Sequence, residues 1–324
     1  MRVTAAGSLP GDDFRGALNA MTEALPEVMP LPELPARGVG SDMVGRALGV
    51  IDELGFDLQP AGWRLTTASG ADHRRAKAQW RRDLDDAEEL LAGFQGVVKI
   101  GLAGPWTLAA AVERPTGDRL LADHGARREL SQALTEAWHR LAADLRRRLP
   151  ASQILLQVDE PALLAVAHGE VPTASGFSRH RKVSAAEIAE ALRLLAPDAW
   201  LHCCAPGDWL DLAAQAGFQV AAIDTRNLQE PRCLDALATW AQEGRGLVAG
   251  VVDTSRHRSQ SADELVAEAL RVLRPLELSQ RALEQQILLG TACGMAGWPQ
   301  RSVTPQLTAL RGPLVAEALA QQRR

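Results

Sequence analysis

The sequence predicts an α/β fold, a single (β/α)8 TIM-like barrel that occupies residues 1–324. Short apolar runs typical of buried parallel strands alternate with longer segments rich in Ala, Leu and Arg, which favour helices. Polar residues recur where these runs end, and barrel enzymes build their active sites at that end of the strands. No G-x-G-x-x-G follows the first run, which disfavours an open dinucleotide-binding sheet. The strand-like runs are Val3–Gly7, Val97–Gly104, Gln153–Asp159, Ala199–Cys204, Gln219–Thr225, Leu247–Asp253, Gln286–Gly294 and, with a weaker pattern, Phe56–Pro60.

The segments between these runs are expected to form the helices of the barrel. Strand and helix alternate about eight times, as a closed barrel requires. The Pro-rich segment Leu25–Pro35 is expected to be an irregular loop and a candidate lid over the barrel mouth, because proline disrupts regular backbone pairing. The helical segments are Asp42–Leu54, Ala71–Leu91, Arg127–Arg148, Ala185–Leu195 and Ala262–Val272.

Composition excludes several classes of protein. The chain is 46% hydrophobic and 23% charged, with a formal net charge of -5, which is ordinary for a globular enzyme. No Lys/Arg cluster is interleaved with aromatic residues, so no nucleic-acid partner is expected. The N-terminus lacks an apolar signal core and no run of 18 apolar residues occurs, which predicts a cytoplasmic protein without a membrane span. Four cysteines in a chain of this length do not indicate a disulfide framework.

A histidine and two cysteines at the end of one strand-like run indicate a metal site. Residues two apart on a strand point to the same side, so His202 and Cys204 face together and Cys203 faces away. An imidazole and a thiolate at this spacing suit Zn²⁺. Cys293 and Asp224 end two other runs and are the candidates for the remaining ligands. Burial in the core is the competing interpretation for any single cysteine. It is the preferred interpretation for Cys233, which lies in a helix-like segment.

Eight short motifs, in the same order, resemble those of the C-terminal catalytic barrel of cobalamin-independent methionine synthases. The resemblance covers nearly the whole chain, and the chain is similar to short versions of the family that lack the N-terminal barrel. The matching segments are Gly7-Ser8-Leu9-Pro10 (G-S-F-P in the family), Ser41-Asp42-Met43-Val44 (N-D-M-V), Gly104-Pro105-Trp106-Thr107 (T-G-P-V-T), Gln157–Leu163 (Q-I-D-E-P-A-L), His202-Cys203-Cys204 (H-M-C), Ile223-Asp224-Thr225 (I-E-T), Gly250–Asp253 (G-V-Y-D), and Cys293-Gly294 followed by Gly297-Trp298-Pro299 (C-G-L and G-W-P).

The resemblance implies roles for most of these residues. It implies that Ser8 and Asp159 hold the amino-acid end of homocysteine. It also implies that Glu160, Gly104 and Thr107 lie near the pocket of the methyl donor. An acidic pair followed by proline is also typical of a helix N-terminus, which is the competing interpretation of the Asp-Glu-Pro segment. The zinc ligands that the resemblance implies are His202, Cys204, Asp224 and Cys293.

Two departures from the family concern the catalytic acid and the substrate ammonium. The family has a histidine, regarded as the proton donor, two residues after the aspartate that matches Asp253. Here that position is Ser255, and His257 is the candidate substitute. The acidic residue expected before N-D-M-V falls on Arg37, and Glu33 is the nearest acid that can bind the ammonium. When methyltetrahydrofolate donates its methyl group, the folate amine is a poor leaving group unless it is protonated. A methyl-corrinoid needs no such proton, so a corrinoid protein becomes a candidate partner.

The function expected from these observations is zinc-dependent transfer of a methyl group to the thiol of homocysteine, which forms methionine. The donor is either methyltetrahydrofolate or a methyl-corrinoid. One alternative is another thiol acceptor, such as coenzyme M, whose sulfonate would require cationic contacts instead of acids. A uroporphyrinogen decarboxylase-like barrel would leave the His, Cys and Asp set unexplained. A non-catalytic zinc-binding or methyl-sensing relative is the remaining alternative, supported by Ser255 alone.

Overall fold

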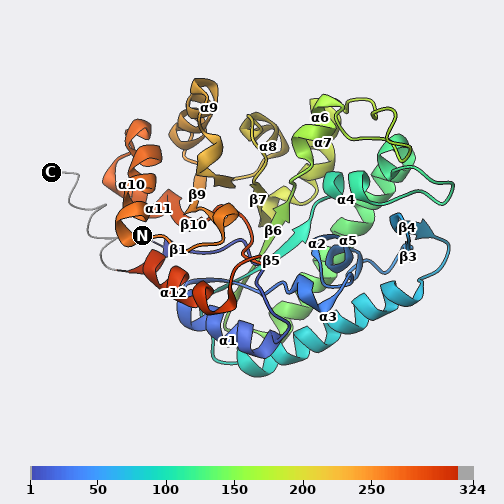
Figure 1. The fold of residues 1–324 in the computed structure, drawn as a ribbon, viewed down its shortest axis with the longest axis horizontal. Coiled ribbons are helices and arrows are strands. Elements are labelled where there is room, and N and C mark those ends of the chain that lie inside the picture. The colour runs from blue at the N-terminus through green and yellow to red at the C-terminus, as the bar shows by residue number, and fades with distance from the viewer. Residues whose placement is uncertain (1, 313–324) are drawn as a thin grey trace.

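Eight parallel strands form a nearly closed barrel in the computed structural model, which describes residues 2–312 (Figure 1). Their order around the sheet is β1-β10-β9-β8-β7-β6-β5-β2. The two end strands are joined by a bridge between Ser8 and Glu33, in which the backbone N–H of Glu33 donates to Gly7. The predicted TIM-like barrel is therefore confirmed. The barrel strands are β1 (Arg2–Val3), β2 (Val28–Pro30), β5 (Val97–Ala103), β6 (Gln153–Asp159), β7 (Ala199–Cys203), β8 (Val220–Asp224), β9 (Gly246–Val252) and β10 (Ile287–Thr291).

Helices surround the barrel. In Figure 1, α8 and α9 lie on one side of the strands and α1, α3 and α12 on the opposite side. Several helices begin at a side-chain cap: Asp42 caps α2, and Ser261 and Glu264 form a capping box at α10. The helices are α1 (Phe14–Ala24), α2 (Met43–Leu48), α3 (Ala71–Leu90), α4 (Pro105–Ala111), α5 (His124–Arg148), α6 (Leu163–His168), α7 (Ala185–Arg193), α8 (Leu210–Ala216), α9 (Pro231–Gln242), α10 (Ala262–Leu273), α11 (Gln280–Gln286) and α12 (Gln300–Arg311).

The eighth barrel strand is the one that the sequence did not predict. The segment Leu25–Pro35, expected to be an irregular lid, contains the buried strand β2. Pro30 is tolerated there because β2 pairs along its length with β5 alone, so the missing N–H breaks no second ladder. The weak strand pattern Phe56–Pro60 is a strand, β3 (Gly55–Gln59), but it pairs antiparallel with β4 (Gly62–Thr66) in a hairpin outside the barrel.

A buried lysine lies inside the barrel, beneath the mouth. The Lys99 ammonium donates to the carbonyl of Ala5 at 2.7 Å and to the side-chain oxygen of Gln157. Burial lowers the pKa of Lys99 to about 7, and the charge of Asp159 only partly opposes this. Gln157 in turn donates to Asp159 at 2.7 Å. A polar chain therefore connects the barrel interior to the mouth.

Among the residues that the structure describes, no helix is both long enough and apolar enough to span a membrane.

Replacing Lys99 by Met should change how stability depends on pH. The unfolded chain holds the lysine proton up to a pH of about 10, whereas the native pKa is about 7. Between these values the unfolded state binds more protons, so wild-type stability rises with pH by about 1 kcal/mol per unit from this group. Urea unfolding of wild type and Lys99→Met across this range measures the difference in slope. Lys182→Met removes an exposed lysine and should keep the wild-type slope. Equal slopes in wild type and Lys99→Met would contradict the assignment.

Candidate metal centre

His202, Cys204 and Cys293 converge at the mouth of the barrel. Their ligand atoms lie within 4.8 Å of one another, and the two sulfur atoms are 3.3 Å apart. His202 lies on β7, Cys204 follows this strand, and Cys293 follows β10. Cys203 turns into the core, as the alternation of side chains on a strand predicts. One imidazole and two thiols form a donor set that zinc prefers, so these residues fit the metal that the sequence predicts.

Asp159 fixes the orientation of the histidine. The Asp159 carboxylate lies 2.7 Å from Nδ1 of His202, while Nε2 lies 3.3 Å from the carbonyl oxygen of Ala292. Burial disfavours the charged imidazole, but the hydrogen bond and charge of Asp159 outweigh it and raise the pKa of His202. A carboxylate on the second ring nitrogen is the usual partner of a metal-binding histidine, since it fixes the tautomer.

The two thiols share one hydrogen bond. The two sulfur atoms lie 3.3 Å apart, and the Cys204 thiol is the donor when Cys293 is a thiolate. The contact lowers the pKa of the Cys293 thiol to about 6, with the charge of His202 acting in the same direction, and raises the pKa of Cys204. One thiol of the pair thus readily loses its proton, and a thiolate is the form that binds metal.

A cavity of about 260 Å³ opens directly beside the cluster. Ser8 donates to the Glu33 carboxylate at 2.7 Å on its wall, and burial raises the pKa of Glu33. Among the described lining residues, Glu33 and Asp159 carry carboxylates and none is Lys or Arg. The cavity therefore suits a small ligand with a cationic group. Its lining residues are Ala6, Gly7, Ser8, Leu31, Glu33, Met43, Gly101, Asp159, Pro161, His202, Cys204, Cys293 and Gly294.

A glycine lets the loop that carries Cys293 approach the first strand. A Cβ added at Gly294 would lie 2.6 Å from the Cβ of Ser8, closer than real Cβ contacts. The next residue, Met295, donates its backbone N–H to the carbonyl of Ser8 at 2.8 Å. The C-G motif therefore places Cys293 against the wall that also carries Ser8.

Glu160, Gly104 and Thr107 are brought together, but they do not line the cavity. The buried Glu160 carboxylate accepts the backbone N–H groups of Trp106 and Thr107 and, at 2.6 Å, the Thr107 hydroxyl. Burial raises the pKa of Glu160 to about 7. A Cβ at Gly104 would lie 2.3 Å from the Glu160 carboxylate, so glycine makes room for it. Glu160, which follows β6, therefore caps the N-terminus of α4, where Gly104 and Thr107 lie.

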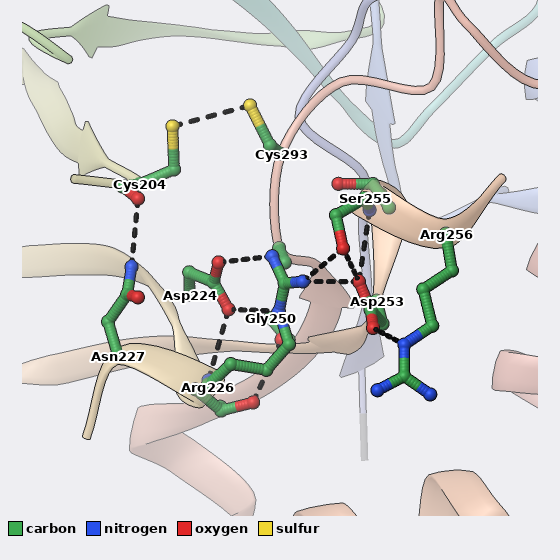
Figure 2. A network of polar contacts seen from close by, with 12 residues as sticks. Cys204, Asp224, Arg226, Asn227, Gly250, Asp253, Ser255, Arg256 and Cys293 are labelled. Carbon is green, nitrogen blue, oxygen red and sulfur yellow. Dashed lines mark hydrogen bonds and ion pairs between the residues drawn. The ribbon is translucent and has the colours of Figure 1, made fainter. Parts of the chain in front are cut away.

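Asp224 does not join the other three expected ligands. Within residues 2–312, the group of ligand atoms within 4.8 Å of one another contains His202, Cys204 and Cys293 only. Figure 2 shows the Asp224 carboxylate facing the guanidinium of Arg226, which also contacts Asp253 and Ser255. Arg226 is not among the residues that the sequence predicted for the site. The signal for it was an arginine two residues after the acidic strand end, within reach of that carboxylate.

Residues 102–313 match the sequence model of the family described as "Cobalamin-independent synthase, Catalytic domain". The chain belongs to this family. A solved structure of a B12-independent methionine synthase from Shewanella sp. W3-18-1, in complex with selenomethionine, is similar in fold, with a TM-score of 0.59 and 13% identity over 99% of this chain and 98% of that chain. A GH20 β-N-acetylhexosaminidase from Streptomyces coelicolor A3(2) aligns over 71% of this chain and 60% of its own, at 11% identity and a TM-score of 0.32, too low to bear on the fold. No curated protein matches the chain.

Ser255 and His257, the residues expected near the catalytic acid, both lie at the surface of this cobalamin-independent synthase domain. Ser255 is exposed, and its hydroxyl donates to the Asp253 carboxylate at 2.6 Å. His257 is also exposed, with a left-handed φ of 50°, and its ring lies against Gly297. The described residues that line the cavity include neither Ser255 nor His257. The structure therefore does not bring a histidine from this loop to the cavity beside the thiols.

Replacing Cys293 by Ser should reduce zinc binding by this domain. The substitution removes one sulfur from the cluster, and loss of a ligand is expected to weaken metal affinity by at least about 100-fold. Metal content after purification with zinc, measured by mass spectrometry, checks the result. Cys233→Ser is the matched control, because Cys233 is buried in α9, outside the cluster. Equal zinc content in wild type and Cys293→Ser would contradict the assignment of the centre.

Proposed function

We propose that this chain transfers a methyl group to the thiol of homocysteine and forms methionine, with zinc held by His202, Cys204 and Cys293. The observation that carries the proposal is the position of the cluster, which lies on the wall of a small, acid-lined cavity. Membership of the cobalamin-independent synthase family supports the same chemistry. The cavity volume of about 260 Å³ suits a small amino acid.

The side chains around the cavity have separate roles in this proposal. Zinc, when bound, supplies the positive charge that favours the deprotonated form of a substrate thiol. Asp159 keeps the His202 ring oriented through its 2.7 Å contact. Glu33, positioned by Ser8, binds the ammonium of the amino acid. An ammonium beside Glu33 would also oppose the effect of burial on the pKa of that carboxyl.

The transfer itself is a displacement at carbon. The thiol first loses its proton to solvent, and the sulfur electron pair then forms a bond to the methyl carbon. The bond between that carbon and the donor breaks, and its electron pair leaves with the donor. Water in the cavity would compete for the methyl group, and the largely apolar walls formed by Leu31, Met43 and Pro161 limit its access.

The cavity and the two thiols argue against the alternative acceptors and reactions. A sulfonate such as that of coenzyme M would face the carboxylates of Glu33 and Asp159, with no Lys or Arg among the described lining residues to offset them. A metal-free decarboxylase would have no use for two thiols that approach within 3.3 Å. A role limited to zinc binding would leave the adjacent cavity without a function.

The donor that we propose is a methyl-corrinoid, delivered by a corrinoid protein, in preference to methyltetrahydrofolate. Cleavage of a carbon–cobalt bond leaves the electron pair on cobalt and needs no proton. A folate amine leaves readily only when it is protonated. Ser255 occupies the position of the expected histidine, and His257 lies apart from the lining of the cavity. Folate chemistry would need a proton donor at the cavity, and this loop supplies no histidine to the described cavity lining.

Glu33→Gln should weaken homocysteine binding without removing zinc. Loss of the carboxylate removes the ion pair with the ammonium, so KM for homocysteine should rise by about 10-fold or more, because a buried charged hydrogen bond is worth roughly 1.5–3 kcal/mol. Steady-state methylation assays on zinc-loaded protein provide KM, and coenzyme M serves as the acceptor control. Methylation of coenzyme M at a kcat/KM equal to or above that of homocysteine would refute an amino-acid acceptor.

The identity of the donor is tested by supplying each candidate separately. With homocysteine present and zinc bound, methylcobalamin should support methionine formation, and methyltetrahydrofolate should support much less. The rate difference should be at least about 100-fold, the typical contribution of a positioned general acid. Turnover with methyltetrahydrofolate at least equal to that with methylcobalamin would reject the corrinoid donor.

A further inference from the structure

The carboxylate expected as the fourth zinc ligand is engaged by an arginine. Arg226 approaches Asp224 with one edge of its guanidinium: Nε donates to Oδ1 at 2.9 Å and Nη2 donates to Oδ2 at 2.5 Å. The backbone N–H of Arg226 donates to Oδ1 as well, at 3.0 Å. Asp224 is only 5% exposed. Both oxygens of this buried carboxylate are therefore directed to one residue, in the bidentate geometry that arginine favours.

Arg226 is itself fixed from the opposite side. Its Nη1 donates to the carboxylate of Asp253 and, at 2.5 Å, to the hydroxyl of Ser255 (Figure 2). A second arginine, Arg256, lies 3.2 Å from the other oxygen of Asp253. Two carboxylates and two guanidinium groups thus alternate in one network that is balanced in charge. Arg226 cannot follow Asp224 toward the thiols without leaving Asp253 and Ser255.

The cluster of His202, Cys204 and Cys293 and the network around Arg226 are neighbours that share no side chain. The atoms of His202, Cys204 and Cys293 satisfy the common 4.8 Å limit, and no oxygen of Asp224 joins them. In Figure 2 the paired sulfur atoms lie apart from the Asp224 carboxylate, which points to Arg226. Moving that carboxylate onto an ion would break its contacts with the guanidinium and leave the arginine with one acidic partner fewer.

We propose that Arg226 holds Asp224 off the metal, so that this chain would hold zinc with three side chains, His202, Cys204 and Cys293, and without a carboxylate ligand. Asp224 then acts as a fixed neighbouring anion whose charge Arg226 neutralises. With a neutral imidazole and two thiolates the protein ligands balance the charge of Zn²⁺, and the incoming thiolate makes the centre anionic. Arg226 is a positioning residue in this scheme. The inference rests on the zinc centre of the proposed function.

The test measures zinc affinity and the ligand set of the full chain, independently of activity. Zinc dissociation constants are obtained by competition with a chromophoric chelator, and the visible spectrum of the Co²⁺-substituted protein reports the ligands. Asp224→Asn should change the zinc dissociation constant by less than about threefold and leave the Co²⁺ spectrum unaltered, whereas loss of a true ligand such as Cys293 weakens binding far more. Asp224→Asn keeps the shape of the side chain and leaves Arg226 its contacts with Asp253 and Ser255, and circular dichroism of the variant should match wild type.

Arg226→Gln tests the same idea from the other side. Release of Asp224 should tighten zinc binding by about 10-fold or more, which is the size of effect expected when the partner of a metal ligand is changed. The Co²⁺ spectrum should also shift, because an oxygen ligand is added. Arg256→Gln is the matched control, because Arg256 contacts Asp253 and should leave both readouts unchanged.

The outcomes separate this inference from the proposed function. A loss of zinc affinity of about 10-fold or more in Asp224→Asn, with a changed Co²⁺ spectrum, would identify Asp224 as a ligand and overturn the inference while the zinc centre stands. Failure of wild type to bind zinc, or equal binding in wild type and Cys293→Ser, would instead overturn the centre itself. Unchanged affinity in Asp224→Asn, together with tighter binding in Arg226→Gln, supports the inference.

Discussion

The close approach of two thiols across the barrel mouth is the interaction on which the site depends. Cys204 follows β7 and Cys293 follows β10, and two other strands separate β7 from β10 in the sheet. Only the curvature of the barrel brings the sulfur atoms to 3.3 Å. The bridge between Ser8 and Glu33 closes this curvature and at the same time forms the acidic wall of the cavity. The same contact therefore closes the fold and completes the cavity beside the thiols.

The barrel interior supports the centre through a chain of polar contacts. Lys99 contacts Gln157, Gln157 contacts Asp159, and Asp159 contacts His202. A buried chain of this kind is costly unless every member is satisfied, and a satisfied chain fixes side-chain orientation. On the other side of the centre, Arg226 holds Asp224. The imidazole and the carboxylate are thus each positioned by residues outside the cluster.

Much of the fold and part of the site could be predicted from the sequence. Seven barrel strands were evident because buried parallel strands are continuous apolar runs, and the alternation at residues 202–204 correctly separated Cys203 from its neighbours. The strand β2 was missed because it is three residues long and ends in proline, a pattern typical of a loop. Asp224 ends its strand as predicted, but its carboxylate binds Arg226, two residues later in the chain. The alternation of side chains along a strand carries no information about this pairing.

Glu160 and Thr107 show what a motif alone leaves open. A motif identifies residues that occur together, whether they contact a substrate or one another. Here their side chains bond to each other at the N-terminus of α4. The glycine at 104 belongs to the same motif because its missing Cβ leaves room for the Glu160 carboxylate. Burial and contact partners, which only the folded chain provides, separate support for the site from direct participation.

X-ray absorption at the zinc K-edge of the zinc-loaded chain tests the central claim most directly. We expect a coordination shell with two sulfur atoms, from Cys204 and Cys293, and one imidazole nitrogen from His202. A shell made of oxygen and nitrogen alone, without sulfur, would contradict it.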